Sequence, residues 1–304
     1  MKLITTGNLR PSSRALVIFI IMTVTNVRVD AQRRSRQAAT LLESGAPTHA
    51  ETLSPSNEIR IVTYNIRWRS GAELDQIVRW LKATEDAKAP VIIALQEVDR
   101  AKLRSGKINH AKAIADNLGM YYAWTAPQSP TVRKKNDEEE TGVELLSHFP
   151  LTEVRRITLP HAGPGGRGRV ALGATIQVAK INVRVYSVHS ETRIPISEKI
   201  EQLRAVLDDL VKAPQPAPAI VMGDFNTWEI AAVGAVRKLF SDAGFKTPFP
   251  DDETTFLRNA VLFDLKLKLD WIWLRGLTSE SYGIDRSLKV SDHFPLWTVV
   301  KISN

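Results

Sequence analysis

The chain has 304 residues, of which 43% are hydrophobic and 24% are charged, so it is long enough for one large globular domain or two modest ones. It contains no cysteine, which excludes a disulfide scaffold, a thiolate zinc site and a cysteine nucleophile. The formal net charge of +8 suits a polyanionic partner such as nucleic acid or a phospholipid surface, and equally suits a charge that only keeps the protein soluble.

The N-terminus has the layout of a secretory signal peptide. A basic stretch up to Arg14 precedes an apolar run over residues 15–22, and a small-residue cleavage pattern ends at Ala31. The apolar run is shorter than the roughly 20 residues that a membrane span requires, so an uncleaved anchor is the secondary interpretation. We therefore expect residues 1–31 to be a signal peptide and the protein to be secreted or periplasmic.

The rest of the chain is predicted to be a linker followed by one domain. Residues 32–57 show no sustained apolar period, which is typical of a flexible linker. Residues 58–302 contain no repeat of fixed period and no second linker, so we expect a single domain over this range.

Within this domain, strand-like and helix-like patterns alternate. Residues 59–64 alternate polar and apolar, as a strand does, and the continuous apolar run 91–95 predicts a strand buried on both faces. The other predicted strands cover residues 143–146, 171–178, 183–188, 219–222, 271–274 and 296–300, and the predicted helices cover residues 73–83, 111–118 (ended by Gly119) and 197–210 (capped by Ser197). Many strands with few helices between them predict two packed sheets with helices outside.

The most informative polar residues stand where predicted strands end, which is where a rigid scaffold usually presents chemistry. They are Asn65, Gln96, Glu97, His189, Asp224, Asn226, Asp270, Asp292 and His293. Each of them alone has a structural explanation, such as a turn, a cap or a salt bridge. Together, their carboxylates and amides favour a hard cation such as Mg²⁺, and the histidines add groups for acid–base catalysis. Zinc is the weaker interpretation because the chain has no HExxH-like histidine pair.

Six short blocks carry a more specific pattern than any single residue. They are residues 62–66 (VTYNI), 95–100 (LQEVDR), 142–147 (GVELLS), 223–226 (GDFN), 269–272 (LDWI) and 291–296 (SDHFPL). In kind and order these blocks resemble the endonuclease/exonuclease/phosphatase superfamily, which includes pancreatic-type deoxyribonuclease and bacterial sphingomyelinases. The chain is therefore identified, by resemblance, as a bacterial secreted member of that family.

The resemblance implies both a fold and a reaction. The fold would be α/β (α+β), a four-layered sandwich of two packed, mainly antiparallel β-sheets flanked by helices. The reaction would be hydrolysis of a phosphoester by in-line attack of water, assisted by Mg²⁺ or else by Mn²⁺ or Ca²⁺. By position in the blocks, Asn65 and Glu97 would bind this metal, with Asp292 helping.

The resemblance also implies the catalytic residues. Asp224 would orient or deprotonate the attacking water, and Asn226 would stabilise the phosphate oxygens. His293, held by Asp270, would contact the scissile phosphate. His189 would assist in phosphate binding or in protonation of the leaving group.

Two departures from the family pattern bear on the substrate. Glu144 stands where most relatives of this type have a small residue; it is interpreted as facing solvent, with orientation of His189 as the alternative. Residues 190–192 (SET) also differ from the commoner, leucine-containing version of their motif.

Basic side chains favour nucleic acid as the substrate. They are Arg100, Lys102, Arg104 and Lys107 after Glu97, residues 133–135 on a polar loop, and Arg167 and Arg169 beside a glycine-rich loop. A solvated surface of mixed charge is the alternative, because acidic residues 137–140 follow the loop lysines.

Three hypotheses follow for a chain that we expect to be a monomer. The first is a secreted nuclease, and the second is a sphingomyelinase-like phosphodiesterase that acts at a phospholipid surface. The third is a non-catalytic binding protein that keeps the fold, which the full set of polar residues disfavours.

Overall fold

The computed structural model of the chain describes residues 41–49, 56–85, 89–128, 140–212, 218–259 and 264–302. The predicted signal peptide, residues 1–31, lies outside these ranges, as do residues 32–40 and 50–55 of the predicted linker and the basic residues 133–135. In the described ranges, no helix is both long enough and apolar enough to cross a membrane.

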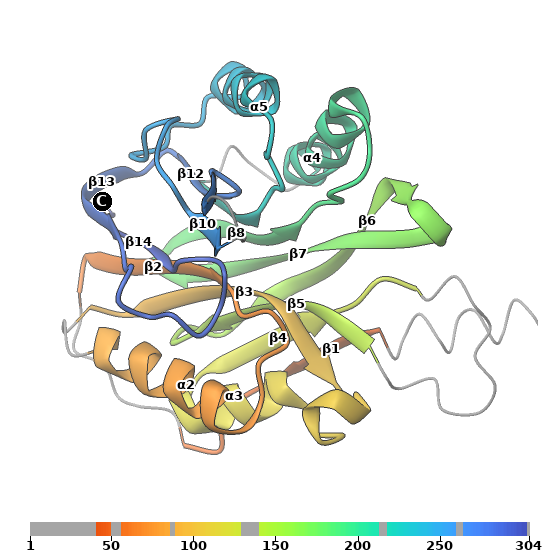
Figure 1. Ribbon diagram of the computed structural model, residues 1–304. Coiled ribbons are helices and arrows are strands. Elements are labelled where there is room, and N and C mark those ends of the chain that lie inside the picture. The colour runs from red at the N-terminus through yellow and green to blue at the C-terminus, as the bar shows by residue number, and fades with distance from the viewer. Residues whose placement is uncertain are drawn as a thin grey trace, which may run out of the picture. The chain divides into compact units, whose positions relative to one another are not determined.

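Two large sheets form the centre of the fold (Figure 1). The seven-stranded sheet has the order β1-β4-β5-β3-β2-β14-β13, with strands β1 (Leu42–Gly45), β2 (Glu58–Asn65), β3 (Val91–Arg100), β4 (Tyr121–Thr125), β5 (Glu140–Ser147), β13 (Thr278–Ile284) and β14 (Leu296–Lys301). The five-stranded sheet has the order β12-β9-β8-β7-β6, with strands β6 (Thr152–Gly163), β7 (Arg167–Val178), β8 (Ile181–His189), β9 (Ala219–Asp224) and β12 (Asp270–Arg275). A separate hairpin pairs β10 (Phe256–Asn259) with β11 (Asp264–Leu267).

Helices cover the outer face of each sheet (Figure 1). They are α2 (Gly71–Glu85) and α3 (His110–Leu118) on the seven-stranded sheet, and α4 (Ile196–Val211) and α5 (Ile230–Asp242) on the five-stranded sheet, with short 3-10 turns at Leu103–Ser105 and Pro164–Gly166. One apolar cluster lies between the two sheets, and one lies under each helix pair. The predicted four-layered sandwich is therefore confirmed.

The alternation of side chains along the strands explains this layering. In β2, Ile59 and Ile61 face the other sheet, whereas Val62 and Tyr64 pack under the helices. Only β2–β3 and β8–β9 are parallel pairs among the described strands, so the sheets are mainly antiparallel, as predicted. Each parallel pair is joined by a crossover helix, α2 or α4, as parallel pairing requires.

Part of the predicted linker belongs to the fold. Leu42–Gly45 pairs antiparallel with β4, and the neighbouring Leu41 is buried in the core. The Glu43 carboxylate accepts hydrogen bonds from Asn109 at 2.8 Å and from the Tyr122 hydroxyl at 2.5 Å. The linker prediction is wrong for this strand, because four residues with a single apolar side chain give no periodic signal.

Two predicted boundaries also differ from the structure. Strand β3 does not end before Glu97 but runs on to Arg100, with a bulge between Gln96 and Val98. Helix α4 begins at Ile196 with Pro195 at its N-cap, so Ser197 is not the cap. The predicted stop of α3 at Gly119 is confirmed, since this residue has the left-handed φ of 64°.

Candidate functional site

The predicted site residues meet where the two parallel strand pairs end. Asn65 is the last residue of β2, and His189 and Asp224 are the paired last residues of β8 and β9. All three side chains point into the space between the sheets, since alternate neighbours on their strands belong to the inter-sheet core. The Asn65 amide donates to Asp224 across this space at 3.0 Å, so polar contacts replace apolar packing at this end of the sandwich.

A β-bulge directs Glu97 towards this site. Glu97 has a φ of 59°, and its backbone carbonyl accepts a hydrogen bond from the Trp68 amide at 2.9 Å. Its carboxylate accepts a hydrogen bond from Asn65 at 3.3 Å. Arg67, Trp68 and Asn226 also have left-handed φ values of 49°, 47° and 52°. Such strained backbone is typical of functional sites, where bulges re-aim side chains.

The GDFN block forms a turn that is held by a hydrogen bond within the block. Gly223 has a φ of 140°, and a Cβ there would lie 2.0 Å from the carbonyl oxygen of Val188 on β8, so only glycine fits. The Asp224 carboxylate accepts the Asn226 amide at 2.9 Å, and the Asn226 side chain donates to the Ser190 carbonyl at 3.0 Å. The turn thereby fixes the Asp224 carboxylate, whose side chain is 2% exposed, at the bottom of the site.

Asp270 and His293 form the predicted pair. His293 Nδ1 lies 2.9 Å from Asp270 Oδ2, and His293 Nε2 lies 3.8 Å from Asp224 Oδ2. Burial by itself would lower the pKa of His293, but Asp270 and Asp224 raise it to about 10. His293 therefore carries its second proton at neutral pH and is a hydrogen-bond donor towards the site.

His189 has the opposite electrostatic environment. Its Nε2 lies 3.5 Å from Asp224 and 4.0 Å from Glu97, while the Arg169 guanidinium lies 3.0 Å from the same nitrogen. Burial and then the charge of Arg169 lower the pKa of His189 well below its ordinary value. The site thus holds one charged and one neutral imidazole, a division typical of acid–base machinery.

Asp224 lies between these histidines. Burial raises the pKa of Asp224, His293 lowers it and Asp270 raises it again, to about 6. A carboxylate in this range is a stronger base than an ordinary aspartate and is still ionised at neutral pH.

The predicted metal ligands are grouped, although not all of them are free. Glu97 and Asn65 are in contact, and the Asn65 amide oxygen, which accepts the Arg67 amide at 3.0 Å, has a second lone pair to offer. Asp292 lines a cavity together with Glu97, but its carboxylate is paired with Arg67 at 3.0 Å. These oxygen donors fit a hard divalent cation. Ligand atoms of Asp224, Asp270 and His293 also lie within 4.8 Å of one another, but a protonated His293 is a poor metal ligand.

Glu144 neither faces solvent nor orients His189. Its cross-strand partners on β3 and β4 are Leu95 and Trp124, which belong to the core under α2 and α3. Its side chain is fully buried, and its two carboxyl oxygens have no hydrogen-bond partner within the described ranges. Burial raises the pKa of Glu144 well above its ordinary value, and the nearby Glu43 adds to this shift.

Replacing Glu144 by methionine is expected to stabilise the protein by about 1–3 kcal/mol at pH 7, because a buried carboxyl without partners is costly. The carboxyl must stay protonated in the folded state, so wild-type stability falls by about 1.4 kcal/mol per pH unit above the unfolded pKa. The gain, measured by urea unfolding, should therefore grow between pH 5 and pH 7. A variant less stable than the wild type at both pH values would contradict this interpretation.

The prediction of site residues missed Glu191, which binds Arg167 and Arg169, two of the basic residues predicted to favour nucleic acid. Glu191 is fully buried and accepts hydrogen bonds from Nε of Arg167 and of Arg169, each at 2.9 Å. Burial would raise the pKa of Glu191, but Arg167 and Arg169 lower it to about 2. The departure at residues 190–192 was visible in the sequence, but Glu191 follows β8 and its partners lie on β7, so no local pattern could pair them.

Replacing Glu191 by glutamine is expected to lower the free energy of unfolding by about 3 kcal/mol at pH 7, from the lowered pKa. A carboxyl whose pKa is lower in the folded state stabilises the fold at pH values above its unfolded-state pKa, and this contribution is lost as the pH falls towards 2. The deficit, measured by urea unfolding, should therefore shrink between pH 5 and pH 3. The matched control is Glu201→Gln, an exposed glutamate paired with His161. A deficit that does not change with pH would contradict the ionic role.

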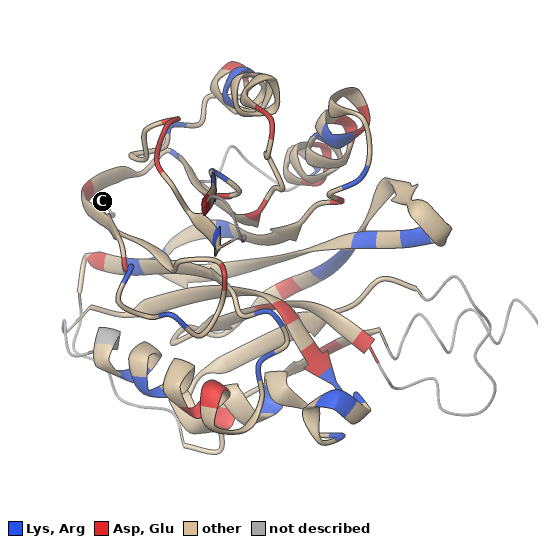
Figure 2. Ribbon diagram, in the orientation of Figure 1, with Lys and Arg blue, Asp and Glu red and all other residues tan. Residues whose placement is uncertain are grey.

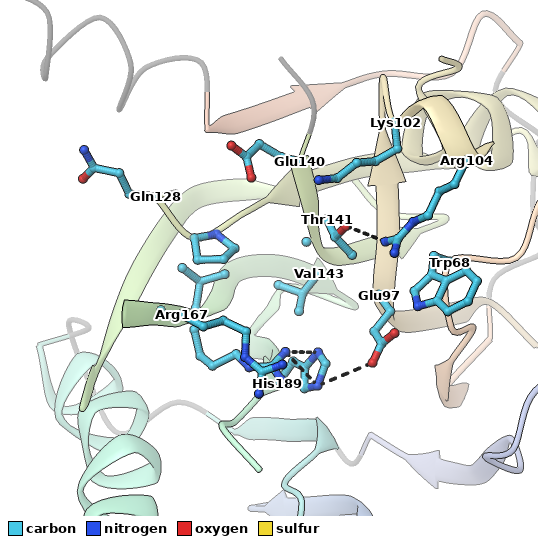
Figure 3. A pocket seen from close by; sticks show the side chains of 15 residues that line it. Trp68, Glu97, Lys102, Arg104, Gln128, Glu140, Thr141, Val143, Arg167 and His189 are labelled. Carbon is cyan, nitrogen blue, oxygen red and sulfur yellow. Dashed lines mark hydrogen bonds and ion pairs between the residues drawn. The ribbon is translucent and has the colours of Figure 1, made fainter. Parts of the chain in front are cut away.

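Two cavities are lined by the predicted site residues. The larger, about 670 Å³, contains Asp224, His293 and Asp292, and the smaller, about 410 Å³, extends past Trp68 and Thr141. They share four lining residues, namely Glu97, Arg167, Arg169 and His189. The two cavities therefore adjoin, and Figure 3 shows the smaller one, with the shared residues Glu97, Arg167 and His189.

Sequence comparison found a matching family model and similar proteins. A family model described as the Endonuclease/Exonuclease/phosphatase family matches residues 62–293. A UPF0294 protein of Yersinia pseudotuberculosis is 26% identical over 267 residues, which cover 85% of this chain and 89% of the relative.

Solved structures share the fold at low sequence identity. An endonuclease/exonuclease/phosphatase family protein from Leptotrichia buccalis has a TM-score of 0.62 at 19% identity and covers 80% of this chain and 99% of its own. D. rerio TDP2 complexed with single strand DNA product has a TM-score of 0.60 at 18% identity, over 81% of this chain and 100% of its own.

Proposed function

Because this chain belongs to the endonuclease/exonuclease/phosphatase family, whose members are nucleases, phosphodiesterases or phosphatases, we propose that it is a divalent-metal-dependent phosphodiesterase that acts on nucleic acid. The observation that carries this proposal is the Asp224 carboxylate, which lies within 4 Å of two imidazoles, the neutral His189 and the charged His293. Glu97 lies next to it through the shared contact with Asn65.

In this proposal one buried side chain accepts the proton of the attacking water, the others contact the phosphate, and solvent water protonates the leaving oxygen. Asp224, with a pKa of about 6, accepts a proton from the attacking water. His293, kept protonated by Asp270, donates a hydrogen bond to a phosphate oxygen, and Asn226 supports a second oxygen with the amide hydrogen that Ser190 does not take. His189 is neutral and lies beside Arg169, so this pair faces the phosphate from the opposite side.

The cation would be held by Glu97 and Asn65, with Asp292 as a further ligand once it exchanges its contact with Arg67. When bound, it would withdraw negative charge from the phosphate oxygens. Magnesium is our first choice because the three donors are all oxygens, with Mn²⁺ and Ca²⁺ as the alternatives.

Two observations support nucleic acid as the substrate. Basic side chains at the start of β7 face the end of β3 across the cleft, and Figure 2 shows both charged segments on one side of the molecule. A phosphate backbone is bound by such groups without reading sequence. In addition, a protein of the same fold has been solved with a single-stranded DNA product.

The test is cleavage of supercoiled plasmid by the purified protein, with Mg²⁺ and with chelator, beside the variant His293→Ala. We expect nicking that requires the metal and falls by about 10²–10³-fold in the variant, the range for losing one donor to a developing charge. If neither plasmid nor a small phosphodiester is hydrolysed with any of the three metals, the proposal of a nucleic-acid phosphodiesterase is wrong.

A phospholipid phosphodiesterase is the second candidate, because the larger cavity has an apolar wall formed by Ile194, Trp228, Leu265 and Leu267. Trp228 is 50% exposed, which is unusual for so large an apolar side chain. Release of choline phosphate from sphingomyelin vesicles, without plasmid cleavage, would favour this candidate.

We also propose that the protein is exported, on the basis of its N-terminal sequence; detection of a shortened chain in the periplasm or medium would test this.

A further inference from the structure

The smaller cavity is lined by more positive than negative side chains. Figure 3 shows Lys102 and Arg104 on one side of it and Arg167 with His189 on the other. Four basic residues line this cavity, namely Lys102, Arg104, Arg167 and Arg169, against two acidic ones, Glu97 and Glu140. Glu97 is the proposed metal ligand, so a bound cation would leave the cavity still more positive.

Buried carboxylates hold the arginines of this cavity from behind. Asp99 accepts Nε and Nη2 of Arg104, both at 2.8 Å, and Glu191 accepts Arg167 and Arg169. The side chains of both carboxylates are 0% exposed, whereas Arg104 and Arg167 are each 43% exposed. The carboxylates therefore fix the guanidinium groups and leave their outer N–H groups at the surface.

Arg104 is fixed by further contacts. It donates to the Thr141 hydroxyl at 2.9 Å, and its guanidinium lies 4.5 Å from the centre of the Trp68 ring. Its Nη1 makes no hydrogen bond within the described ranges. A guanidinium held in this way loses little entropy when it binds an anion, and its planar fork matches phosphate.

Lys102 supplies the unpaired charge. Its side chain makes no hydrogen bond or ion pair with any residue that the structure describes, and it lies beside Arg104 in the smaller cavity (Figure 3). Because the two cavities share Glu97, Arg167, Arg169 and His189, an anion beside Lys102 would occupy a cavity that adjoins the one lined by Asp224 and His293.

We propose that the smaller cavity is a second phosphate site, which binds the phosphate adjacent to the scissile one on the same nucleic-acid strand through Lys102, Arg104 and Arg167. This inference rests on the proposed phosphodiesterase function and narrows its substrate. A phosphodiester with a single phosphate, such as a phospholipid, leaves this site unfilled, whereas a nucleic-acid strand fills both sites.

The test uses Lys102→Ala and Lys102→Glu. The backbone of Lys102 is extended, with φ −68° and ψ 139°, and its side chain makes no capping bond, so both variants should fold. The matched control is Lys238→Ala, which removes the same charge from helix α5, where the lysine is 77% exposed and pairs with Asp242.

Binding is measured first, without turnover. The full chain in EDTA is titrated against a fluorescein-labelled 8-nucleotide single strand and followed by fluorescence anisotropy. We expect Kd to rise about tenfold in Lys102→Ala and further in Lys102→Glu, and the slope of log Kd against log salt to fall by about 0.7, as for one lost contact to a single strand. Lys238→Ala should match the wild type.

Hydrolysis is then compared on two substrates with Mg²⁺: the same strand and bis(4-nitrophenyl) phosphate, which has one phosphate. The ratio of kcat/KM for the strand to kcat/KM for the small diester should fall about tenfold in Lys102→Ala. If the wild type hydrolyses the small diester but Lys102→Ala keeps both the ratio and Kd, the second site is wrong and the phosphodiesterase stands. If the wild type hydrolyses neither, the proposed function fails, and this inference fails with it.

Discussion

Replacing Asp224 by asparagine is expected to lower kcat for a small phosphodiester by a factor of about 10²–10⁴, the range of general-base catalysis. Asparagine keeps the shape of the side chain, but its single amide oxygen can accept only one of the two hydrogen bonds that Asp224 accepts, from Asn65 on Oδ2 at 3.0 Å and from the Asn226 amide on Oδ1 at 2.9 Å. It also loses the ability to take a proton. The measurement is the initial rate at saturating bis(4-nitrophenyl) phosphate and metal.

A fall in rate must be separated from a loss of fold. Because Asp224 is buried between two histidines, its replacement could destabilise the fold. The thermal unfolding temperature of the Asp224→Asn protein is therefore measured together with its rate. The matched control is Asp242→Asn, which changes an exposed aspartate on α5 and should keep the full rate. If the folded Asp224→Asn protein turned over within threefold of the wild type, Asp224 would not be the base, and the site would need another proton acceptor.

Replacing Glu97 by glutamine is expected to have the second largest effect, through the metal. Of the two proposed carboxylate ligands, Asp292 is paired with Arg67, whereas Glu97 is not. Because Glu97→Gln removes the unpaired carboxylate, we expect the half-saturating concentration of Mg²⁺ to rise at least tenfold. The maximal rate should also fall by about 10²-fold, since less charge on the phosphate is neutralised. For the wild type, chelator should abolish hydrolysis and added Mg²⁺ should restore it.

Metal binding can also be measured without an activity assay. Mg²⁺ that binds only the folded state raises the unfolding temperature. This rise should be seen in the wild type and in Glu280→Gln, a control at an exposed position on β13, and should be lost in Glu97→Gln. If Glu97→Gln kept the same rise, the metal would lie elsewhere, and the cluster of Asp224, Asp270 and His293 would be the next candidate.

Local sequence was sufficient to predict the scaffold of the site. The alternation in β2 and the apolar runs in β3 and β9 are signals that depend only on neighbouring residues, because they reflect which faces of a strand are buried. Asn65, His189 and Asp224 could then be recognised as polar residues where apolar runs stop, and each does end its strand. Helix α5 was not predicted, since its central Gly234 and a short polar face weaken the helical pattern.

Other features depend on partners far away in the chain, and only the tertiary structure decided them. Glu144 resembles any polar residue on a half-exposed strand, and its burial arises because β5 lies between β3 and β4 under the helices. The Glu97 bulge depends on how β3 pairs with β5, which no local pattern encodes. The pKa of His189 is lowered by burial and then by Arg169, whereas the pKa of His293 is raised against its burial by Asp270, and each of these partners is about 20 residues away in the chain. The sequence by itself therefore determined which chemistry is available, whereas charge states and positions were decided by long-range contacts, because Coulomb interactions and burial depend on distance in space and not along the chain.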